Sequence, residues 1–367
     1  MAGALYVASR RRAAGPPPSL IDWEKVRAIA TLIARHDSQS YQDVMPEYAE
    51  MVGRSQRVIA EYTREPLPVG TDHVYVFDRV QWLEANVAAF RELFEPVERI
   101  NGSLLAGRLG LSALGDVNQI LLSSQMGLLL GYLSRRVLGQ YDLALLGREP
   151  VTTGRLYFVE PNIRQLEGRL GLVPKDFRLW IALHETTHAY EFEAHPWLRD
   201  HMNGLLRRYF DALGDDLGNL RSDLRGLGNF ARRIGANLGQ KGYAVELVMT
   251  PEQRAIFRAL QALMCLLEGY SNHVMDAVGR DLLPSYRQMK DRFESRLKKK
   301  GPAERLFAKL TGLDLKMEQY QLGERFVNAV VERVGVAGMN RVWRGPEALP
   351  TLEEIREPRL WIERIPS

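Results

Sequence analysis

The chain of 367 residues has little cysteine and little histidine, with one cysteine, Cys265, and seven histidines. One thiol excludes a disulfide within the chain and a metal site built from several of its own cysteines. Histidine and carboxylate side chains remain as candidate metal ligands. Scarce cysteine is typical of a reducing compartment, and residues 1–18 lack the order of basic flank, apolar core and cleavage site that marks a signal peptide. We therefore expect a cytoplasmic protein.

Long hydrophobic runs are also lacking. The most apolar stretch, residues 119–139, has an apolar core of only about ten residues before Arg135 and Arg136, whereas a membrane-spanning helix needs roughly 20. Gly127 and Gly131 have the spacing that lets two helices approach closely. The sequence predicts a buried helix with close backbone contacts and no membrane span.

Neither sign of charge is in large excess, because 49 lysines and arginines face 45 acidic residues, for a net charge of +4 and a pI of about 9.1. The basic runs are confined to residues 10–12 and 298–300. Short runs of this kind are typical of solvated loops and helix ends. We expect no nucleic-acid partner, and the sequence gives no indication of the oligomeric state.

Apolar periodicity divides the chain into three parts. Residues 1–20 form a flexible, Pro-rich tail, residues 21–150 a mostly helical region, and residues 151–367 the region that carries the chemistry. The alternative is that the last two regions are one continuous domain. A short alternation at residues 73–77 predicts an extended segment, and residues 155–163 predict a strand closed by a proline and an asparagine.

Three further segments carry helix signals. One helix is predicted from near Pro174, with Asp176 as its N-cap, to Pro196. The glycine-rich residues 203–240 predict several short helices, and the prolines of residues 346–365 predict an extended C-terminal arm over the body of the protein.

An H-E-x-x-H motif lies within LHETTHAYEFEAHPW, a stretch that holds three of the seven histidines. On a helix, His184 and His188 lie on one face about 6 Å apart along the axis, so both imidazoles can reach one ion. Glu185 lies about 100° round the helix, where it can accept the proton of a zinc-activated water that attacks a polarised carbonyl group. The motif predicts a zinc site with Glu185 as general base.

His195 is excluded as the third ligand on axial distance. It follows His188 by seven residues, about 10 Å if the helix continues. A histidine returns to the metal when a glycine breaks the helix early, and here Glu191 occupies that position. We expect His195 at the helix end or on the surface.

A second helix supplies the third ligand. Thr250 as N-cap, followed by a proline and by Gln253 as the reciprocal capping residue, predicts its start. Glu268 falls on or beside its apolar stripe, where a carboxylate needs a positive partner such as zinc or an arginine. His273, about 140° further round, remains the alternative ligand, or acts as an oxyanion donor paired with Asp276.

Asn272, one turn beyond Glu268, is the predicted acceptor for the ring N–H of a ligand histidine. The expected architecture is a mainly helical protein in which the helix with the motif packs on this second long helix. Gly269 beside Glu268 favours the close approach of another helix.

These residues resemble the zincin-like metallopeptidases, and within them a group of actinobacterial and related proteins linked with hydrolysis and with deazaflavin-coenzyme biosynthesis. The resemblance covers most of the chain beyond Val151 and rests on LYFVEPNI, HETTHAYEFEAHPWL, LLEGYSNHVMD and the C-terminal blocks at residues 319–335 and 342–365. It implies a mainly helical zincin-like fold with His184, His188 and Glu268 as zinc ligands and Glu185 as base. The chain departs from the gluzincin pattern at Asn272, where thermolysin-like enzymes carry an aspartate.

Two classes of function follow from this reading. The first is a zinc-dependent hydrolase, most readily a metallopeptidase. The second is a zinc-bearing scaffold or binding protein in which the metal ties two helices together without turnover. A third, weaker alternative is the binding of a partner or a membrane surface through the glycine-rich helices near residues 110–139.

Overall fold

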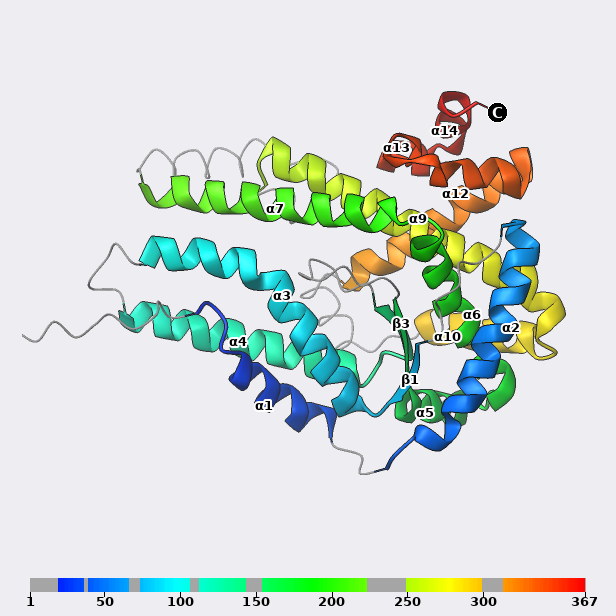
Figure 1. The fold of residues 1–367 in the computed structure, drawn as a ribbon, viewed down its shortest axis with the longest axis horizontal. Helices are drawn as coiled ribbons and strands as arrows, with labels where there is room; N and C mark the ends of the chain where they lie inside the picture. Colours follow the sequence, from blue (N-terminus) through cyan, green and yellow to red (C-terminus); the bar gives the residue numbers. More distant parts are fainter. Residues whose placement is uncertain are drawn as a thin grey trace, which may run out of the picture.

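A computed structural model describes residues 19–35, 39–65, 73–105, 112–142, 154–222, 249–298 and 313–366. These residues form an extensively helical protein with one small sheet (Figure 1). The mainly helical class predicted from the sequence is confirmed. No helix among the described residues is long and apolar enough to span a bilayer.

The described residues form the following helices and strands, in chain order within each group. The helices are α1 Trp23–Ala34, α2 Met45–Thr63, α3 Arg79–Leu105, α4 Ser112–Ser134, α5 Glu160–Leu170, α6 Pro174–Glu193, α7 Trp197–Ser222, α9 Pro251–Leu282, α10 Tyr286–Lys298, α12 Leu313–Met339, α13 Leu352–Arg356 and α14 Pro358–Arg364. The strands are β1 Val74–Phe77, β2 Gly139–Asp142 and β3 Arg155–Val159.

The sheet has the order β1-β3-β2, with β1 parallel and β2 antiparallel to the central strand. The extended segment expected at residues 73–77 is β1. The strand expected at residues 155–163 ends earlier, at Val159, because Pro161 falls in the first turn of α5, where a missing N–H costs nothing. β2 was not predicted, since GQYD has little of the β-branched content that marks a strand.

Helix α6 is buried on nearly every side and its residues from Leu183 to Phe192 are almost all inaccessible. Its N-cap is Val173, not the predicted Asp176, whose carboxylate instead accepts hydrogen bonds from the backbone and hydroxyl of Ser285. Arg178 anchors the helix, because it pairs with the fully buried Glu160 of α5 at 3.0 Å. The motif is therefore carried on a helix fixed in the interior.

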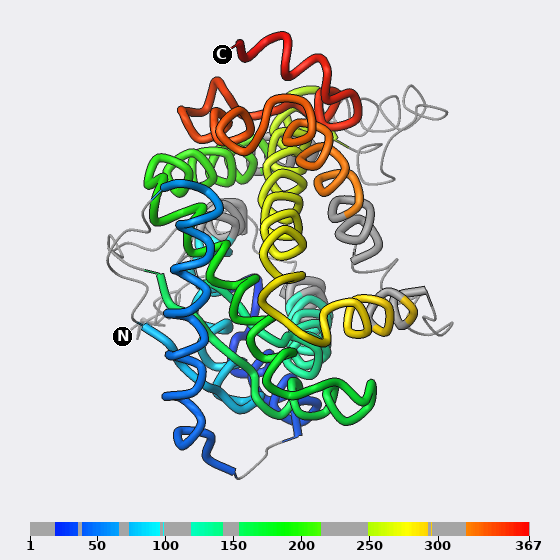
Figure 2. Tube along the Cα trace, turned by 90° about the vertical axis from the view of Figure 1, so that its right-hand side faces the viewer, coloured from blue at the N-terminus to red at the C-terminus, as the bar shows by residue number. Residues whose placement is uncertain are grey.

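Helix α9 begins as predicted, with Thr250 and Gln253 forming a reciprocal capping box. It packs closely on α12, where Gly269 meets Gly323. A Cβ atom at Gly323 would lie 1.8 Å from the carbonyl oxygen of Cys265, so the two backbones touch at this point. Figure 2 shows α9, in yellow, beside the orange α12 and near the green α6.

Two expectations for the C-terminal half are wrong. Residues 197–222 form the single helix α7, which passes through Gly204 without a break, whereas residues 223–248 lie outside the described part of the chain. The expected extended arm contains α13 and α14, because Pro346 and Pro358 each stand in the first turn of a helix. Trp361 of α14 is fully buried and packs edge-on against Phe326 of α12.

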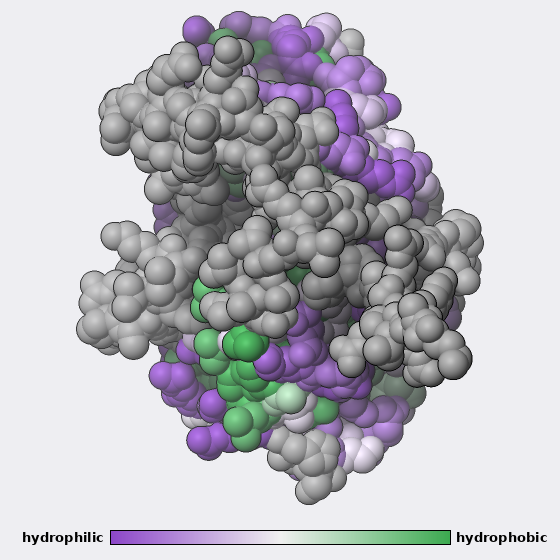
Figure 3. Space-filling view, turned by 90° about the vertical axis from the view of Figure 1, so that its left-hand side faces the viewer, coloured by the Kyte–Doolittle hydropathy of each residue, from purple (hydrophilic) through white to green (hydrophobic). Residues whose placement is uncertain are grey.

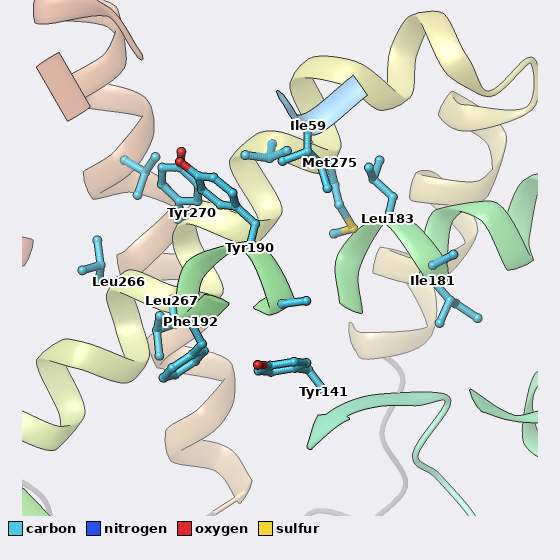
Figure 4. Close-up of a cluster of buried hydrophobic side chains, with 14 of the residues drawn as sticks. Ile59, Tyr141, Ile181, Leu183, Tyr190, Phe192, Leu266, Leu267, Tyr270 and Met275 are labelled. Atoms are coloured by element: carbon cyan, nitrogen blue, oxygen red, sulfur yellow. The ribbon is translucent and has the colours of Figure 1, made fainter. Parts of the chain in front are cut away.

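Two hydrophobic clusters hold the structure together. The larger joins α2, α6, α9 and α12 with the sheet, and Figure 4 shows part of it around Leu183, Tyr190, Tyr270 and Met275. The smaller joins α1, α3 and α4. The larger cluster contains both Val76 and Phe158, and the division at residue 150 stays a prediction.

Candidate metal centre

Two imidazoles of α6 and one carboxylate of α9 converge in the interior. The Nε2 atoms of His184 and His188 lie 3.8 Å and 3.7 Å from Oε2 of Glu268. One ligand atom from each of these residues lies within 4.8 Å of the other two. The pairing of α6 with α9 therefore brings together the three residues that the sequence singled out as ligands.

The donor set fits zinc in chemistry and in size. Zinc takes imidazole nitrogen and carboxylate oxygen at about 2.0–2.2 Å, which places tetrahedral ligand atoms about 3.3–3.6 Å apart. The distances of 3.8 Å and 3.7 Å exceed this by only a few tenths of an ångström. Small rotations of the three side chains would close them on one ion.

Each histidine has its other ring nitrogen engaged. Nδ1 of His184 lies 2.9 Å from the hydroxyl oxygen of Ser271, and Nδ1 of His188 lies 2.8 Å from Oε2 of Glu191. Ser271 also donates to the carbonyl oxygen of His184, so its oxygen accepts from the ring. These contacts favour the tautomer that carries hydrogen on Nδ1 and leave both Nε2 lone pairs facing Glu268.

The charges around the histidines favour a cation. Burial by itself would lower the pKa of His188, but the carboxylates of Glu191 and Glu268 raise it well above its usual value. Burial raises the pKa of Glu191 to about 7, although His188 opposes that shift. Carboxylates removed from water need positive charge nearby, which a proton or a metal ion supplies.

Glu185 is almost completely buried and points toward the sheet. A Cβ atom at Gly139 of β2 would lie 2.7 Å from its Cγ and 2.8 Å from its Oε1. The absence of a side chain at Gly139 therefore leaves the space that Glu185 occupies. The carboxylate lies between the motif helix and the edge strand of the sheet.

His195 takes no part in this centre. It follows the end of α6 and stacks on Trp343, with ring centroids 5.1 Å apart and ring planes 11° from parallel. Burial lowers its pKa to about 4. Its exclusion from the ligand group agrees with the axial argument, but it lies in an aromatic cluster with Tyr190 and not on the open surface.

His273 also lies apart from the ligand group. Its Nε2 is 2.5 Å from the hydroxyl of Tyr62 and its Nδ1 is 2.5 Å from Oδ1 of Asn328. The predicted pairing with Asp276 is electrostatic only: burial lowers the pKa of His273 and the Asp276 carboxylate opposes that shift, while the carboxylate accepts its hydrogen bonds from Tyr286 and Lys290.

Sequence reasoning missed two partners of the centre. Asn272 was the expected acceptor for a ligand histidine, but Ser271, one residue earlier, faces α6. Glu191 was noted only as a substitute for a helix-breaking glycine. Its position three residues after His188, one turn along the same face, was the signal that could have identified it.

Comparison with known proteins agrees with the fold. The sequence model of the zincin-like metallopeptidase family matches residues 21–362. A solved structure from Chloroflexus aurantiacus, described as a "putative hydrolase with a novel fold", is 41% identical with a TM-score of 0.69, and the match covers 94% of this chain and 98% of that one. No curated protein matches the chain. A match over nearly the whole length shows that the chain belongs to the zincin-like metallopeptidase family.

Proposed function

We propose that this protein is a zinc-dependent hydrolase that cleaves peptide bonds. The observation that carries the proposal is the convergence of His184, His188 and Glu268 in the described structure, with no fourth histidine, cysteine or carboxylate in the same group. Catalytic zinc sites use three protein ligands and keep one position open, whereas structural sites are closed by four.

The centre also meets the solvent. The side chains of His184 and His188 are 19% and 16% exposed, while Glu268 is 6% exposed. The two histidines are thus the partly accessible members of the group, and Glu268 is the buried one. Water and substrate would approach from the histidine side.

The residues of the chain have separate roles in this proposal. His184 and His188 bind the ion through Nε2, held in orientation by Ser271 and Glu191, and Glu268 offsets its charge. Bound zinc lowers the pKa of water and polarises a carbonyl group. Glu185 would accept a proton from the water whose oxygen bonds to the carbonyl carbon, and would return that proton to the amine nitrogen as the carbon–nitrogen bond breaks.

Metal analysis combined with the Glu185→Gln variant tests the proposal. We expect about one zinc per chain in the wild type. Peptide mixtures analysed by mass spectrometry should reveal cleavage products that the variant fails to form, with a rate lowered by about 10²–10⁴-fold and with its zinc retained. Full activity in Glu185→Gln would rule out the mechanism.

The scaffold alternative gives a different result. A metal that only ties α6 to α9 would raise the thermal stability on binding, but no peptide would be cleaved by the wild type or by the variant. Loss of zinc in His188→Ala with full retention in Glu268→Ala would exclude Glu268 as the third ligand.

A further inference from the structure

Helices α1 and α4 lie side by side and run in the same direction. A Cβ atom at Gly127 would lie 2.8 Å from Cβ of Ile29, and one at Gly131 would lie 2.7 Å from Cβ of Ile33. The two glycines thus let the helices touch along adjacent turns. The close contact predicted from their spacing is present, between two helices of the same chain.

Helix α3 covers only one face of this pair. The smaller hydrophobic cluster contains Val26 and Ala30 of α1, Leu130 of α4 and Leu83 of α3. Leu32 follows Val26 by six residues and Ala30 by two, which places its side chain about 120–160° round the helix from these two buried side chains. The opposite face of the pair is left without a covering helix in the described structure.

That opposite face is apolar. Leu32 is 82% exposed, and Leu121 and Leu128 of α4 are 53% and 52% exposed. Of the six large hydrophobic side chains that are exposed in the described structure, five lie on α1 and α4, with Val173 as the exception. Such a concentration marks an interaction surface, because scattered single residues are the ordinary case. Figure 3 shows hydrophobic residues gathered in one area of the lower half of the molecule.

The charged residues beside these leucines are basic. Lys25 precedes Leu32 by two helical turns on the same side, and Arg35 follows directly after the end of α1. Arg135 and Arg136 follow α4 at the same end of the pair, and the Arg136 guanidinium lies 3.6 Å above the ring of Tyr132. We call this surface the outer face; it comprises Leu32, Leu121, Leu128, Lys25, Arg35, Arg135 and Arg136.

Among the described residues of α1, acidic side chains do not neutralise the outer face. Glu24 is the exposed carboxylate in the described α1, and it lies 4.0 Å from Arg27, which also pairs with Glu84 of α3 at 3.1 Å. That pairing draws Glu24 toward the side of the helix that α3 covers. A second copy of the outer face would bring like charges together, whereas an anionic surface would complement them.

We propose that the outer face docks onto an anionic lipid surface. The leucines enter the boundary between headgroups and acyl chains, and the lysine and arginines contact phosphate groups at the rim. The glycine contacts hold α1 and α4 as one two-helix platform, so the leucines of both helices meet the bilayer together. The proposal is independent of the zinc centre and of hydrolysis.

Vesicle co-sedimentation of the full-length protein tests this docking. The wild type should sediment with vesicles of phosphatidylcholine and phosphatidylglycerol, less at high salt, and not with phosphatidylcholine alone. Leu32→Ser/Leu128→Ser should bind at least about tenfold more weakly, because two apolar anchors are removed. Arg135→Gln/Arg136→Gln should lose the preference for the anionic vesicles.

Val173→Ser is the matched control. Val173 is 46% exposed at the N-cap of α6, away from the outer face, and serine suits an N-cap. This variant should sediment like the wild type, and all variants should keep the thermal midpoint of the wild type. Equal binding by the leucine variant, or equal binding to neutral vesicles, would overturn the proposal. So would leucine-dependent self-association in light scattering without any vesicle binding, which would assign the face to a second copy.

Discussion

The α6–α9 pair and the α1–α4 pair depart from the usual distribution of polar and apolar residues in opposite directions. On α6 and α9, the carboxylates of Glu185, Glu191 and Glu268 are withdrawn from water. On α1 and α4, Leu32 and Leu128 are turned toward it. Both departures oppose stability, since burying charge and exposing apolar surface are each unfavourable.

The difference indicates two kinds of binding. In the first proposal, buried carboxylates beside imidazoles form a compact site for a small cation, and specific hydrogen bonds hold its members. In the second proposal, exposed leucines on a two-helix platform form a broad site that binds a lipid surface through apolar area and charge. Residues that lower the stability of the fold often serve a function. In this chain such residues lie in two separate regions, at the metal centre and on the outer face.

The largest expected effect is on the stability of the protein, at two glycines where helices touch. Gly323 lies where α12 meets α9, and Gly131 lies where α4 meets α1. Gly323→Ala should lower the free energy of unfolding by about 3 kcal/mol, because the new Cβ meets the rigid backbone of Cys265. Gly131→Ala should cost less, about 2 kcal/mol, because its new Cβ would lie 2.7 Å from Cβ of Ile33, a milder clash than the 1.8 Å contact at Gly323, although the backbone fixes both atoms.

Urea denaturation followed by circular dichroism measures both glycine effects. Gly53→Ala in α2 is the control, since a Cβ there has no neighbour within 4 Å and should raise the stability by about 0.5–1 kcal/mol. Equal losses in Gly323→Ala and Gly131→Ala would show that the two helix contacts are equally rigid.

A smaller effect is expected for the carboxylate that orients His188. Glu191→Gln should weaken zinc binding by about 10–100-fold, because an amide orients the ring but adds no negative charge. Competition with a chromogenic chelator measures the affinity. Glu193→Gln is the matched control on the same helix, since that carboxylate accepts hydrogen bonds from Tyr141 and Gly154 and contacts neither histidine ligand.

Two results for these variants would contradict the proposed role of Glu191. Unchanged affinity in Glu191→Gln would mean that its burial serves packing alone. Equal weakening in both variants would mean that the loss reflects a general loosening of α6 and not the orientation of His188.

The smallest expected effect is the pH dependence contributed by His195. Burial lowers the pKa of this group from 6.5 to about 4, so the folded state favours the neutral ring. Its contribution to stability is present above pH 6.5 and is lost as the pH falls toward 4, because the unfolded chain takes up the proton first. His195→Phe should therefore lose less stability than the wild type between these pH values.

Thermal unfolding in the presence of a chelator measures this difference without interference from metal release. A chelator is needed because protonation of the metal ligands also releases zinc at low pH. Parallel stability curves for the wild type and His195→Phe would show that the buried ring does not titrate on unfolding as proposed.

Part of the site could be predicted because local geometry determines it. The spacing of His184 and His188 on a helix is fixed by the helical repeat, and the position of Glu268 on an apolar stripe makes it a buried carboxylate. Both arguments need only one helix at a time. The start of α9 at Thr250 was predictable for the same reason.

The residues that contact the proposed ligands could not be predicted from single helices. Whether Ser271 or Asn272 faces His184 depends on the crossing of α6 over α9, which no single helix determines. The position of Glu185 depends on β2, whose sequence has a weak strand signal and which is paired only in the folded sheet. The exposed leucines were missed because an apolar run predicts burial, and the uncovered side of α4 depends on where α3 lies.

In the proposed mechanism, the fit of Glu185 beside Gly139 makes the position of the base depend on the register of a four-residue strand. Gly139 stands opposite Phe158 in the antiparallel pair. A shift of β2 by one residue would turn a side chain toward the place of the glutamate. The short edge strand thus sets the position of the Glu185 carboxylate. Substitutions that shift the register of β2, far from the proposed zinc ligands, would impair proton transfer and leave the metal content unchanged.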